Sequence, residues 1–436
     1  ADATVTLQPG TPAFKTAFDR VISDPDLLTG SKFQDQSKIY HGDANYNLRD
    51  LVDFADVQVG GSWRQYSLNS SGTIFTDYDG PIDYNEYGAY TQIQKKFVDD
   101  RLKFTGSLRY DKAKNFDGSF SPRVSLSYSL GEGKTRNLRA SFQTGFRNPT
   151  TQDQYIGLDA GVGILVGSAP DNLDRYTTNP LTVSANGQMI VNNLTGGSIG
   201  STTTLTGRDA YENAFSASSI ANGTYQKANF DYVKPEKVTA YEVGYRAGFG
   251  KLALDMSAYY NKYEDFIGGK NVAVPFYGNP NLSDIVDLTP IGGAPTPLAL
   301  VALSQGDYKG FAIYTNSTAD VTSYGATIGV TTKMFGNYNV GLNYTFAKFD
   351  FDQATDPDYE AGFNTPEHKV KVSFGNYELI ENLGFNINLR WNDEYLWEST
   401  FADAIIGAKT VVDAQINYSV PSFKSTFKIG AANLGG

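Results

Sequence analysis

The sequence of 436 residues contains no cysteine and only two histidines. Without cysteine the chain has no disulfide scaffold, which is compatible with export to an oxidising compartment but does not by itself show it. His41 and His368 lie far apart, and no cluster of histidine and cysteine has the spacing of a zinc site. A P-loop is missing as well. We therefore expect no enzymatic activity, no metal site and no cofactor.

Long apolar runs are also missing. No window of 18 or more apolar residues exists, which excludes a transmembrane helix. The first ten residues, ADATVTLQPG, contain no basic region followed by an apolar segment, so we expect any secretion signal to have been removed or never to have been part of this sequence. The net charge is −11, and acidic and basic residues are interspersed without a basic stripe. Nucleic acid is therefore not expected as a partner.

Aromatic residues and glycine are abundant, with 29 Tyr, 27 Phe and 44 Gly, and they occur in alternating patterns. In residues 337–351, NYNVGLNYTFAKFDF, Tyr338 and Leu342 point to one side of an extended chain and Asn339 and Gly341 to the other. This period of two predicts β-strands. It recurs in fourteen segments, at residues 38–48, 54–66, 86–97, 101–112, 121–130, 136–146, 237–249, 251–265, 322–334, 337–351, 368–377, 382–391, 409–419 and 423–433.

The segments are long for strands of a soluble protein, which usually have about five or six residues. A strand of about twelve residues rises about 3.3 Å per residue, and with a tilt of about 40° it spans roughly 30 Å. That length covers the apolar band of an outer-membrane barrel, which is about 25 Å tall.

The connections between the segments alternate in length. Short links, such as VDD, GEGK and FGN, are followed by long ones at residues 67–85, 111–120, 147–235, 265–320, 350–366 and 392–408. A transmembrane barrel has tight turns on the periplasmic side and long loops outside. In a soluble β-sandwich the apolar side would be the core, and alternation alone does not separate the two. Strand length, one-sided loops and aromatic residues near strand ends favour an all-β fold, a transmembrane antiparallel β-barrel.

Several motifs resemble the barrel domain of TonB-dependent outer-membrane receptors. They are RASFQTGFRNPTTQDQY (139–155), the run from VKPEKVTAYEVGY to YEDFIGG (233–269), NTPEHKVKVSF (364–374), and VVDAQINYSV with KIGAANL (411–434). The runs VQVGGSWRQYSLNSSGTIF, YGAYTQI and LKFTGSLRYD resemble receptors of the Bacteroidetes group. The motifs follow the order of the family over most of the chain.

The resemblance implies a closed barrel of 22 strands filled by an N-terminal plug domain. About fourteen strands are present here, which would be strands eight to twenty-one of the family. We expect residues 1–436 to form a single β-barrel domain, with 1–37 as a loop or irregular lead-in and 147–235 and 265–320 as long extracellular loops. Nothing resembles a plug, a TonB box or the final aromatic strand, so we interpret the chain as a fragment of a longer receptor. A genuine fourteen-stranded porin-like channel is the alternative.

The resemblance also implies a function in the bacterial outer membrane. Receptors of this kind bind a scarce extracellular ligand and import it with energy delivered through TonB. The implied partners are outer-membrane lipid, TonB through the missing plug region, and a small extracellular ligand such as a siderophore, a glycan or a peptide; a surface lipoprotein stays open. Alternatives are a passive channel, a barrel serving in surface adhesion or a secretion complex, and a soluble carbohydrate-binding protein.

Ligand contacts are expected in the extracellular loops and the upper lumen. Aromatic faces suit ligands with apolar patches, and Arg147, at the lumen mouth, is placed to meet an anion, although a structural role is favoured for it. The acidic loop 352–360 is interpreted as solvated rather than as a Ca²⁺ site. The candidate ligand-binding residues are Arg147, Tyr155, Tyr176, Tyr211, Phe276, Tyr277, Tyr395 and Trp397.

Overall fold

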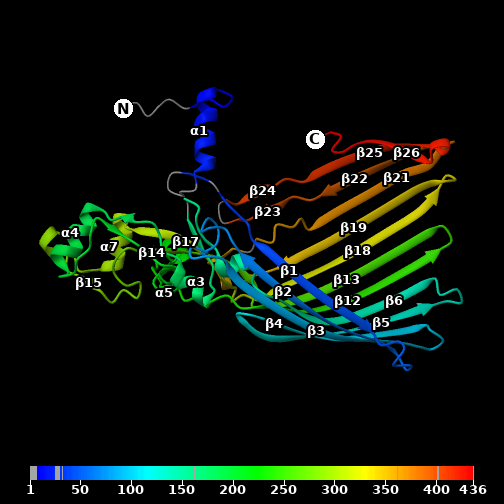
Figure 1. The fold of residues 1–436 in the computed structure, drawn as a ribbon, viewed down its shortest axis with the longest axis horizontal. Helices are drawn as coiled ribbons and strands as arrows, with labels where there is room; N and C mark the ends of the chain where they lie inside the picture. The colour runs from blue at the N-terminus through cyan, green and yellow to red at the C-terminus, as the bar shows by residue number, and fades with distance from the viewer. Residues whose placement is uncertain are drawn as a thin grey trace.

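The computed structural model describes residues 7–24, 30–31, 33–161, 163–360, 362–399 and 402–435. Its main element is a curved antiparallel sheet of fourteen strands whose spatial order follows the chain (Figure 1). The strands are β1 Lys38–Asn47, β2 Asp56–Leu68, β3 Ile82–Phe97, β4 Leu102–Ala113, β5 Phe116–Leu130, β6 Arg136–Arg147, β12 Glu236–Phe249, β13 Leu252–Glu264, β18 Val321–Met334, β19 Tyr338–Asp350, β21 His368–Ile380, β22 Leu383–Asn392, β25 Lys409–Val420 and β26 Ser425–Ala431. All fourteen predicted segments are confirmed.

The strand register gathers the apolar side chains on one face of this sheet. Leu342 of β19 lies opposite Val330 of β18 and Val372 of β21, whereas Asn343 lies opposite Gly329 and Lys371. We call the side that carries Leu342 the outer face and the side that carries Asn343 the inner face. The two faces alternate along every strand because the side-chain period is two.

The apolar face is the more exposed of the two. In β6 the outer residues Leu138, Ala140 and Phe142 are exposed, whereas the inner residues Arg139 and Ser141 that alternate with them are half-buried. A soluble sandwich would bury its apolar face in a core. The main sheet therefore has the distribution of polarity expected of a barrel wall in lipid.

One end of the main sheet carries the short connections, most of which are tight turns. Between β3 and β4 the chain reverses through Val98, Asp99 and Asp100, which have φ of 53°, 52° and 60°. These left-handed conformations let the chain turn within a few residues. A 3-10 helix, η3 Pro421–Phe423, makes the turn between β25 and β26. In Figure 1 these turns lie on the right.

At the opposite end one predicted long loop is wrong. Residues 111–120 form a short hairpin, because β4 continues to Ala113 and β5 begins at Phe116, with a register shift between Asp111 and Ala113. The polar run KAKN interrupts the alternation and therefore resembles a loop in the sequence. At the tips of barrel strands both faces meet water, so polar residues continue the strand pairing there.

The two longest connections fold together into a compact lobe beyond this end of the main sheet (Figure 1). Its sheet has the order β11-β14-β17-β8-β7, and β20 pairs with β14. The strands are β7 Gly157–Asp159, β8 Ile164–Val166, β11 Phe215–Ser216, β14 Ile267–Pro275, β17 Tyr308–Asn316 and β20 Tyr359–Glu360. The helices are α2 Thr151–Tyr155, α3 Pro170–Arg175, α4 Ala185–Leu194, α5 Gly207–Glu212, α6 Ala217–Ala221 and α7 Leu298–Gln305.

Smaller elements complete the fold. They are the helix α1 Pro12–Ser23, the 3-10 helices η1 Thr289–Ile291 and η2 Gln353–Thr355, and three short ladders: β9 Leu181–Thr182 with β10 Thr202–Thr203, β15 Ile285–Val286 with β16 Thr296–Pro297, and β23 Tyr395–Trp397 with β24 Ala404–Ile406. The lead-in segment thus contains a helix, α1, which Thr11 caps by accepting a hydrogen bond from the backbone N–H of Phe14. Among the described residues, no helix is long and apolar enough to cross a membrane.

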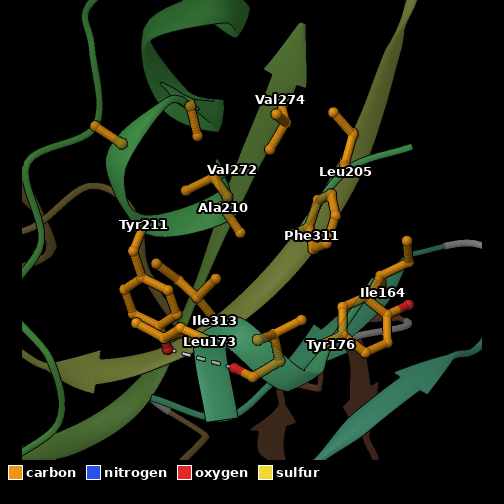
Figure 2. Close-up of a cluster of buried hydrophobic side chains, with 13 residues drawn as sticks. Ile164, Leu173, Tyr176, Leu205, Ala210, Tyr211, Val272, Val274, Phe311 and Ile313 are labelled. Atoms are coloured by element: carbon orange, nitrogen blue, oxygen red, sulfur yellow. Dashed lines mark hydrogen bonds between the residues drawn. The ribbon is translucent and has the colours of Figure 1, made fainter. Parts of the chain in front are cut away.

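The lobe has its own hydrophobic core. Phe311 and Ile313 of β17 pack with Val272 of β14 and Ile164 of β8, and α5 covers them with Tyr211 (Figure 2). These residues come from both long connections, so neither connection can bury its apolar side chains alone. A second core lies where the main sheet meets the lobe, and there Leu68 of β2 and Tyr84 of β3 pack with Tyr155 of α2.

The acidic loop 352–360 is only partly solvated, so the interpretation from sequence is wrong for part of it: residues 352–355 are exposed, whereas Asp356 and Tyr359 are buried. Asp356 is buried and forms an ion pair with Lys270 of β14, and the Asp358 carboxylate accepts hydrogen bonds from Ser216 and Ser218. The loop is therefore fastened to the lobe by two of its carboxylates. The sequence could not show this, because the partners lie about 90 and 140 positions away.

Candidate ligand-binding site

A charged cavity of about 440 Å³ lies in the inner face of β2 to β6, near the end of the sheet that carries the lobe. The side chains that give it its charge come from five neighbouring strands, because the register places alternate residues of each strand on this face. Its acidic and basic lining residues are His41, Arg64, Glu86, Arg109, Asp111, Lys112 and Arg123.

Arg64 is held at the centre of this cavity by its cross-strand neighbours. It lies opposite His41 of β1 and Glu86 of β3 in the register. Its Nη1 is 3.6 Å from the Glu86 carboxylate and donates a hydrogen bond to Tyr66 Oη at 3.1 Å. The guanidinium of Arg64 is therefore held in place without a ligand.

Arg109 takes its position from a glycine. The guanidinium of Arg109 lies over Gly88 of β3, where a Cβ would overlap it, and reaches Ser62 Oγ of β2 at 3.2 Å. Its Nε also donates to the Asp111 carboxylate at 2.7 Å. Arg109 of β4 reaches Ser62 of β2 by passing over residue 88 of β3. A side chain at residue 88 would block the guanidinium, so Gly88 is required for the shape of the wall.

Arg123 is the free cation of the cavity. Its side chain is exposed, and within the described part of the chain it has neither an ion-pair partner nor a hydrogen-bond partner. Three arginines of the inner face, Arg64, Arg109 and Arg123, line the cavity against the two carboxylates of Glu86 and Asp111; Lys112 also lines it, from a register position on the outer face. The wall is therefore positively charged although the whole chain is acidic, and it favours an anionic group.

Arg147 lies at the mouth but is engaged. Its Nη2 is 2.7 Å from Oε2 of Glu236, and the same carboxylate oxygen accepts a hydrogen bond from the backbone N–H of Ile267 at 3.1 Å. Glu236 is buried, so this arrangement fastens the start of β14 to the ends of β6 and β12. The geometry supports the structural role that the sequence favoured for Arg147.

Three of the candidate tyrosines are buried, Tyr176 and Tyr211 in the core of the lobe and Tyr155 in the core between the lobe and the main sheet. Tyr155 is 0% exposed and Tyr176 and Tyr211 are each 4% exposed. Tyr211 donates a hydrogen bond to the carbonyl of Tyr314 at 2.7 Å, and its burial raises the pKa of the phenol well above its usual range. Asn115 donates to Tyr155 Oη at 2.8 Å, which ties the lobe to the tip of the β4–β5 hairpin. In this conformation these rings shape the lobe rather than offer a surface.

The remaining four candidates lie in two other places. Tyr277 is buried and donates a hydrogen bond to Asp307 at 2.7 Å, and Phe276 packs between two hydrophobic cores of the lobe. Tyr395 and Trp397 lie in the β23–β24 hairpin, where Trp397 is 43% exposed. The structure therefore does not bring the eight candidates into one site, and their ligand contacts stay a prediction.

The charged residues of the cavity were missed from sequence, although the signal was present. Arg64, Arg109 and Arg123 occupy polar positions of the alternating pattern in three different segments. Aligning the segments by their turns would have placed them on one wall. Among the described residues, no group of three or more His, Cys, Asp or Glu side chains is placed to hold a metal ion.

Long antiparallel strands, an exposed apolar face and a charged inner face define a membrane β-barrel protein. Comparison with protein families assigns it more closely: the chain belongs to the family described as TonB dependent receptor-like, beta-barrel, whose model matches residues 4–434. Proteins of this family are receptors and transporters of the bacterial outer membrane and not enzymes. The likeness to Bacteroidetes receptors stays a prediction.

Solved structures share the fold at low sequence identity. A mutant of the ferric enterobactin receptor PfeA from Pseudomonas aeruginosa has 15% identity and a TM-score of 0.57, covering 94% of this chain and 50% of that one. The siderophore receptor PirA from Acinetobacter baumannii has 14% identity and a TM-score of 0.54, with coverages of 91% and 50%. The FrpB iron transporter from Neisseria meningitidis has 11% identity and a TM-score of 0.54, with the same coverages.

The chain thus spans about half the length of these structures. A search of curated proteins gave no match.

Proposed function

We propose that this chain is the barrel of an outer-membrane receptor that binds a scarce anionic ligand outside the cell and imports it with energy delivered through TonB. Family membership supports a receptor or transporter, and the structures with the same fold include a siderophore receptor and an iron transporter. The observation that carries the choice of ligand is the positively charged cavity of about 440 Å³ with the unpaired Arg123 on its wall.

The proposal includes an orientation. The lobe, built from residues 147–235 and 265–320, stands outside the cell, and the tight turns face the periplasm. The cavity then lies in the upper lumen, beneath the lobe, where an incoming ligand passes. Residues 1–436 act as one barrel domain, and TonB acts through a plug region outside this chain. We propose Arg147, Phe276, Tyr277, Tyr395 and Trp397 as rim residues that shape or contact the entrance.

The chemistry favours ligands with carboxylate or catecholate oxygens. A guanidinium presents five N–H donors in a fixed fork, which matches pairs of anionic oxygens. Ferric siderophores carry such oxygens in clusters, whereas a neutral glycan has no charge for Arg123 to meet. A siderophore is therefore our proposed ligand class, ahead of a glycan or a peptide.

Ligand binding to the full-length receptor tests this function. We expect uptake of iron from a panel of carboxylate and catecholate siderophores, and a loss of affinity of about tenfold or more for Arg123→Gln, because a hydrogen bond to a charged group contributes about 1.5–3 kcal/mol. Arg208→Gln is the matched control, since Arg208 lies on the surface of the lobe and is paired with Asp174 and Glu212.

Two results would contradict the proposal. If the Arg123→Gln variant bound anionic ligands as tightly as the wild type does, and neither protein distinguished anionic from neutral ligands, the charged cavity would not be the recognition site. Steady ion conductance of the full-length protein in a planar bilayer, without any ligand saturation, would instead favour a passive channel.

A further inference from the structure

A groove of about 690 Å³ crosses the outer face of the main sheet, whereas the charged cavity lies on the inner face. Its floor is a row of small side chains: Ala140 of β6, Ala258 of β13 and Ala326 of β18 lie in one register row, with Val243 of β12 between the first two. The outer surface is recessed over this row, because alanine has only a methyl group whereas the residues of the adjacent row have large side chains.

Large apolar side chains form the wall of the groove. The adjacent row, one step nearer the tight turns, contains Leu138, Tyr245, Met256 and Ile328 in register. All of these residues line the groove, so its surface is apolar. The volume lies in the range of about 300–1,000 Å³ that is common for small-ligand sites. On a face that meets the hydrocarbon of the membrane, the ligand that fits is an acyl chain.

An unpaired cation stands at one end of this groove. Arg136 is the first residue of β6 and lies on the outer face, two positions before Leu138 and so about 7 Å along the strand. Its side chain is exposed, and it has no ion-pair or hydrogen-bond partner among the described residues. It lies beside Gly131, where a Cβ would come to 3.1 Å from its Nη2.

The position of Arg136 fits a headgroup. A free guanidinium within hydrocarbon is costly, and arginines near the ends of membrane segments extend toward the interface. Arg136 borders the tight turn at residues 131–135, which is the rim of the barrel. When the phosphate of a lipid contacts Arg136, its acyl chain can extend along Leu138 into the groove over Ala140. The charged group and the apolar surface therefore follow one another in the same order as the headgroup and acyl chain of a phospholipid.

We propose that the groove and Arg136 form a binding site for one phospholipid of the periplasmic leaflet. The phosphate of the lipid accepts hydrogen bonds from Arg136, and one acyl chain occupies the groove. The choice of leaflet rests on the proposed orientation with the tight turns toward the periplasm, and it excludes lipopolysaccharide, which occupies the outer leaflet. The site itself is independent of the imported ligand.

Lipid retained by the full-length receptor after purification in mild detergent tests the site. Native mass spectrometry of the wild type is expected to show one bound phospholipid, and exchange of its lipids for phosphatidylglycerol is expected to preserve this stoichiometry. Ala258→Trp fills the floor and Arg136→Gln removes the charge, and each is expected to lower the retained lipid at least tenfold. Ala326→Leu, which adds less volume, serves where Ala258→Trp does not fold.

Matched controls are available on the same face. Ala89→Trp places the same bulk on an exposed outer position of β3, and Lys95→Gln removes an outer cation whose Nζ lies 5.8 Å from the centre of the Phe54 ring. Neither residue lines the groove, so both variants are expected to keep the lipid. Equal retention in groove variants and controls would overturn the site. Retention of lipopolysaccharide in place of phospholipid would overturn the assignment to the periplasmic leaflet.

Ligand binding measured on the same samples separates this proposal from the receptor function. Groove variants are expected to bind ferric siderophore as the wild type does. If the wild type and the controls retained the lipid but no sample bound a siderophore, that result would contradict the receptor function and leave the lipid site intact.

Discussion

Lys270 and Asp356 form a buried ion pair between the sheet of the lobe and the loop that follows β19. The Nζ to Oδ1 distance is 2.7 Å, and the side chains are 2% and 4% exposed. Asp356 also accepts hydrogen bonds from Ser317 Oγ at 2.8 Å and from the backbone N–H of Thr318 at 2.9 Å. Three segments distant in sequence are therefore joined at one carboxylate, and the loop 350–366 becomes part of the lobe.

Removal of one partner of this pair is expected to destabilise the lobe. Asp356→Ala leaves the Lys270 ammonium buried without a counter-ion, a change that typically costs about 3–5 kcal/mol. Hydrogen exchange of β14 and of residues 352–360 is expected to rise together, while exchange in β5 and β6 stays unchanged.

The double variant Lys270→Met with Asp356→Met is the control for this prediction. It removes both charges and is expected to recover most of the loss, since apolar side chains can replace a buried ion pair at little cost. An Asp356→Ala variant with wild-type protection would show that the pair contributes nothing to the lobe.

Gly88 is expected to control the charged cavity through Arg109. In Gly88→Leu the new side chain occupies the space of the Arg109 guanidinium and separates it from Ser62 and Asp111. We expect affinity for an anionic ligand to fall about tenfold, corresponding to one hydrogen bond of a charged group. The same substitution at Gly42 of β1, where nothing lies within 4 Å of the added Cβ, is expected to leave affinity unchanged. Equal effects at both positions would contradict this prediction.

Tyr211 and Trp397 are expected to respond in opposite ways to substitution. Tyr211→Phe removes the hydrogen bond to the Tyr314 carbonyl and is expected to lower the stability of the lobe by about 1–3 kcal/mol with no change in ligand affinity. Trp397→Ala removes an exposed ring and is expected to leave stability unchanged and to weaken binding. Thermal unfolding and ligand titration on both variants check this. If Tyr211→Phe lost ligand affinity without losing stability, the prediction would be wrong and Tyr211 would contact the ligand.

Asp153 is expected to make the lobe more stable in mild acid. Burial raises the pKa of its carboxyl above the usual value, against the opposing hydrogen bonds from Thr150. The folded state therefore binds a proton more readily than the unfolded state, and this contribution to stability grows as pH falls from above the folded pKa toward the unfolded pKa of about 3.9.

Asp153→Asn is expected to remove that pH dependence. The amide oxygen still accepts the hydrogen bond from Thr150 N–H, which is 2.7 Å in the wild type. Hydrogen exchange of α2 at pH 7 and pH 5 is the measurement. Protection in the wild type should increase at the lower pH relative to the variant, and a decrease would contradict the sign.

The strands could be predicted from the sequence, but the lobe and the charged cavity could not. Alternation such as that of Tyr338, Val340 and Leu342 is local, so it predicted all fourteen strands of the main sheet. The core of the lobe joins Ile164 to Phe311 across two connections, and no local pattern indicates such a pairing. Polar loop composition therefore resembled an unstructured segment.

The candidate tyrosines show the same limit. An aromatic residue in a polar loop can meet a ligand or fill a core, and only the three-dimensional packing distinguishes the two. Tyr155 and Tyr211 are enclosed by residues that the sequence does not place nearby. Arg64 and Arg123 were overlooked for the opposite reason: each occupies an ordinary polar position of a strand, and their convergence follows from the register of five strands.

The outward orientation of the apolar face is tested most directly by site-directed spin labelling. Because residues 1–436 contain no cysteine, a cysteine at Leu342 or at Asn343 is the single labelling site in this part of the protein. In lipid bilayers the label at Leu342, which is 47% exposed, is predicted to collide often with oxygen and rarely with a water-soluble nickel chelate. The label at Asn343 is predicted to show much lower oxygen collision. A label at Leu342 that meets the nickel chelate freely, or that both reagents fail to reach, would contradict a barrel wall facing lipid.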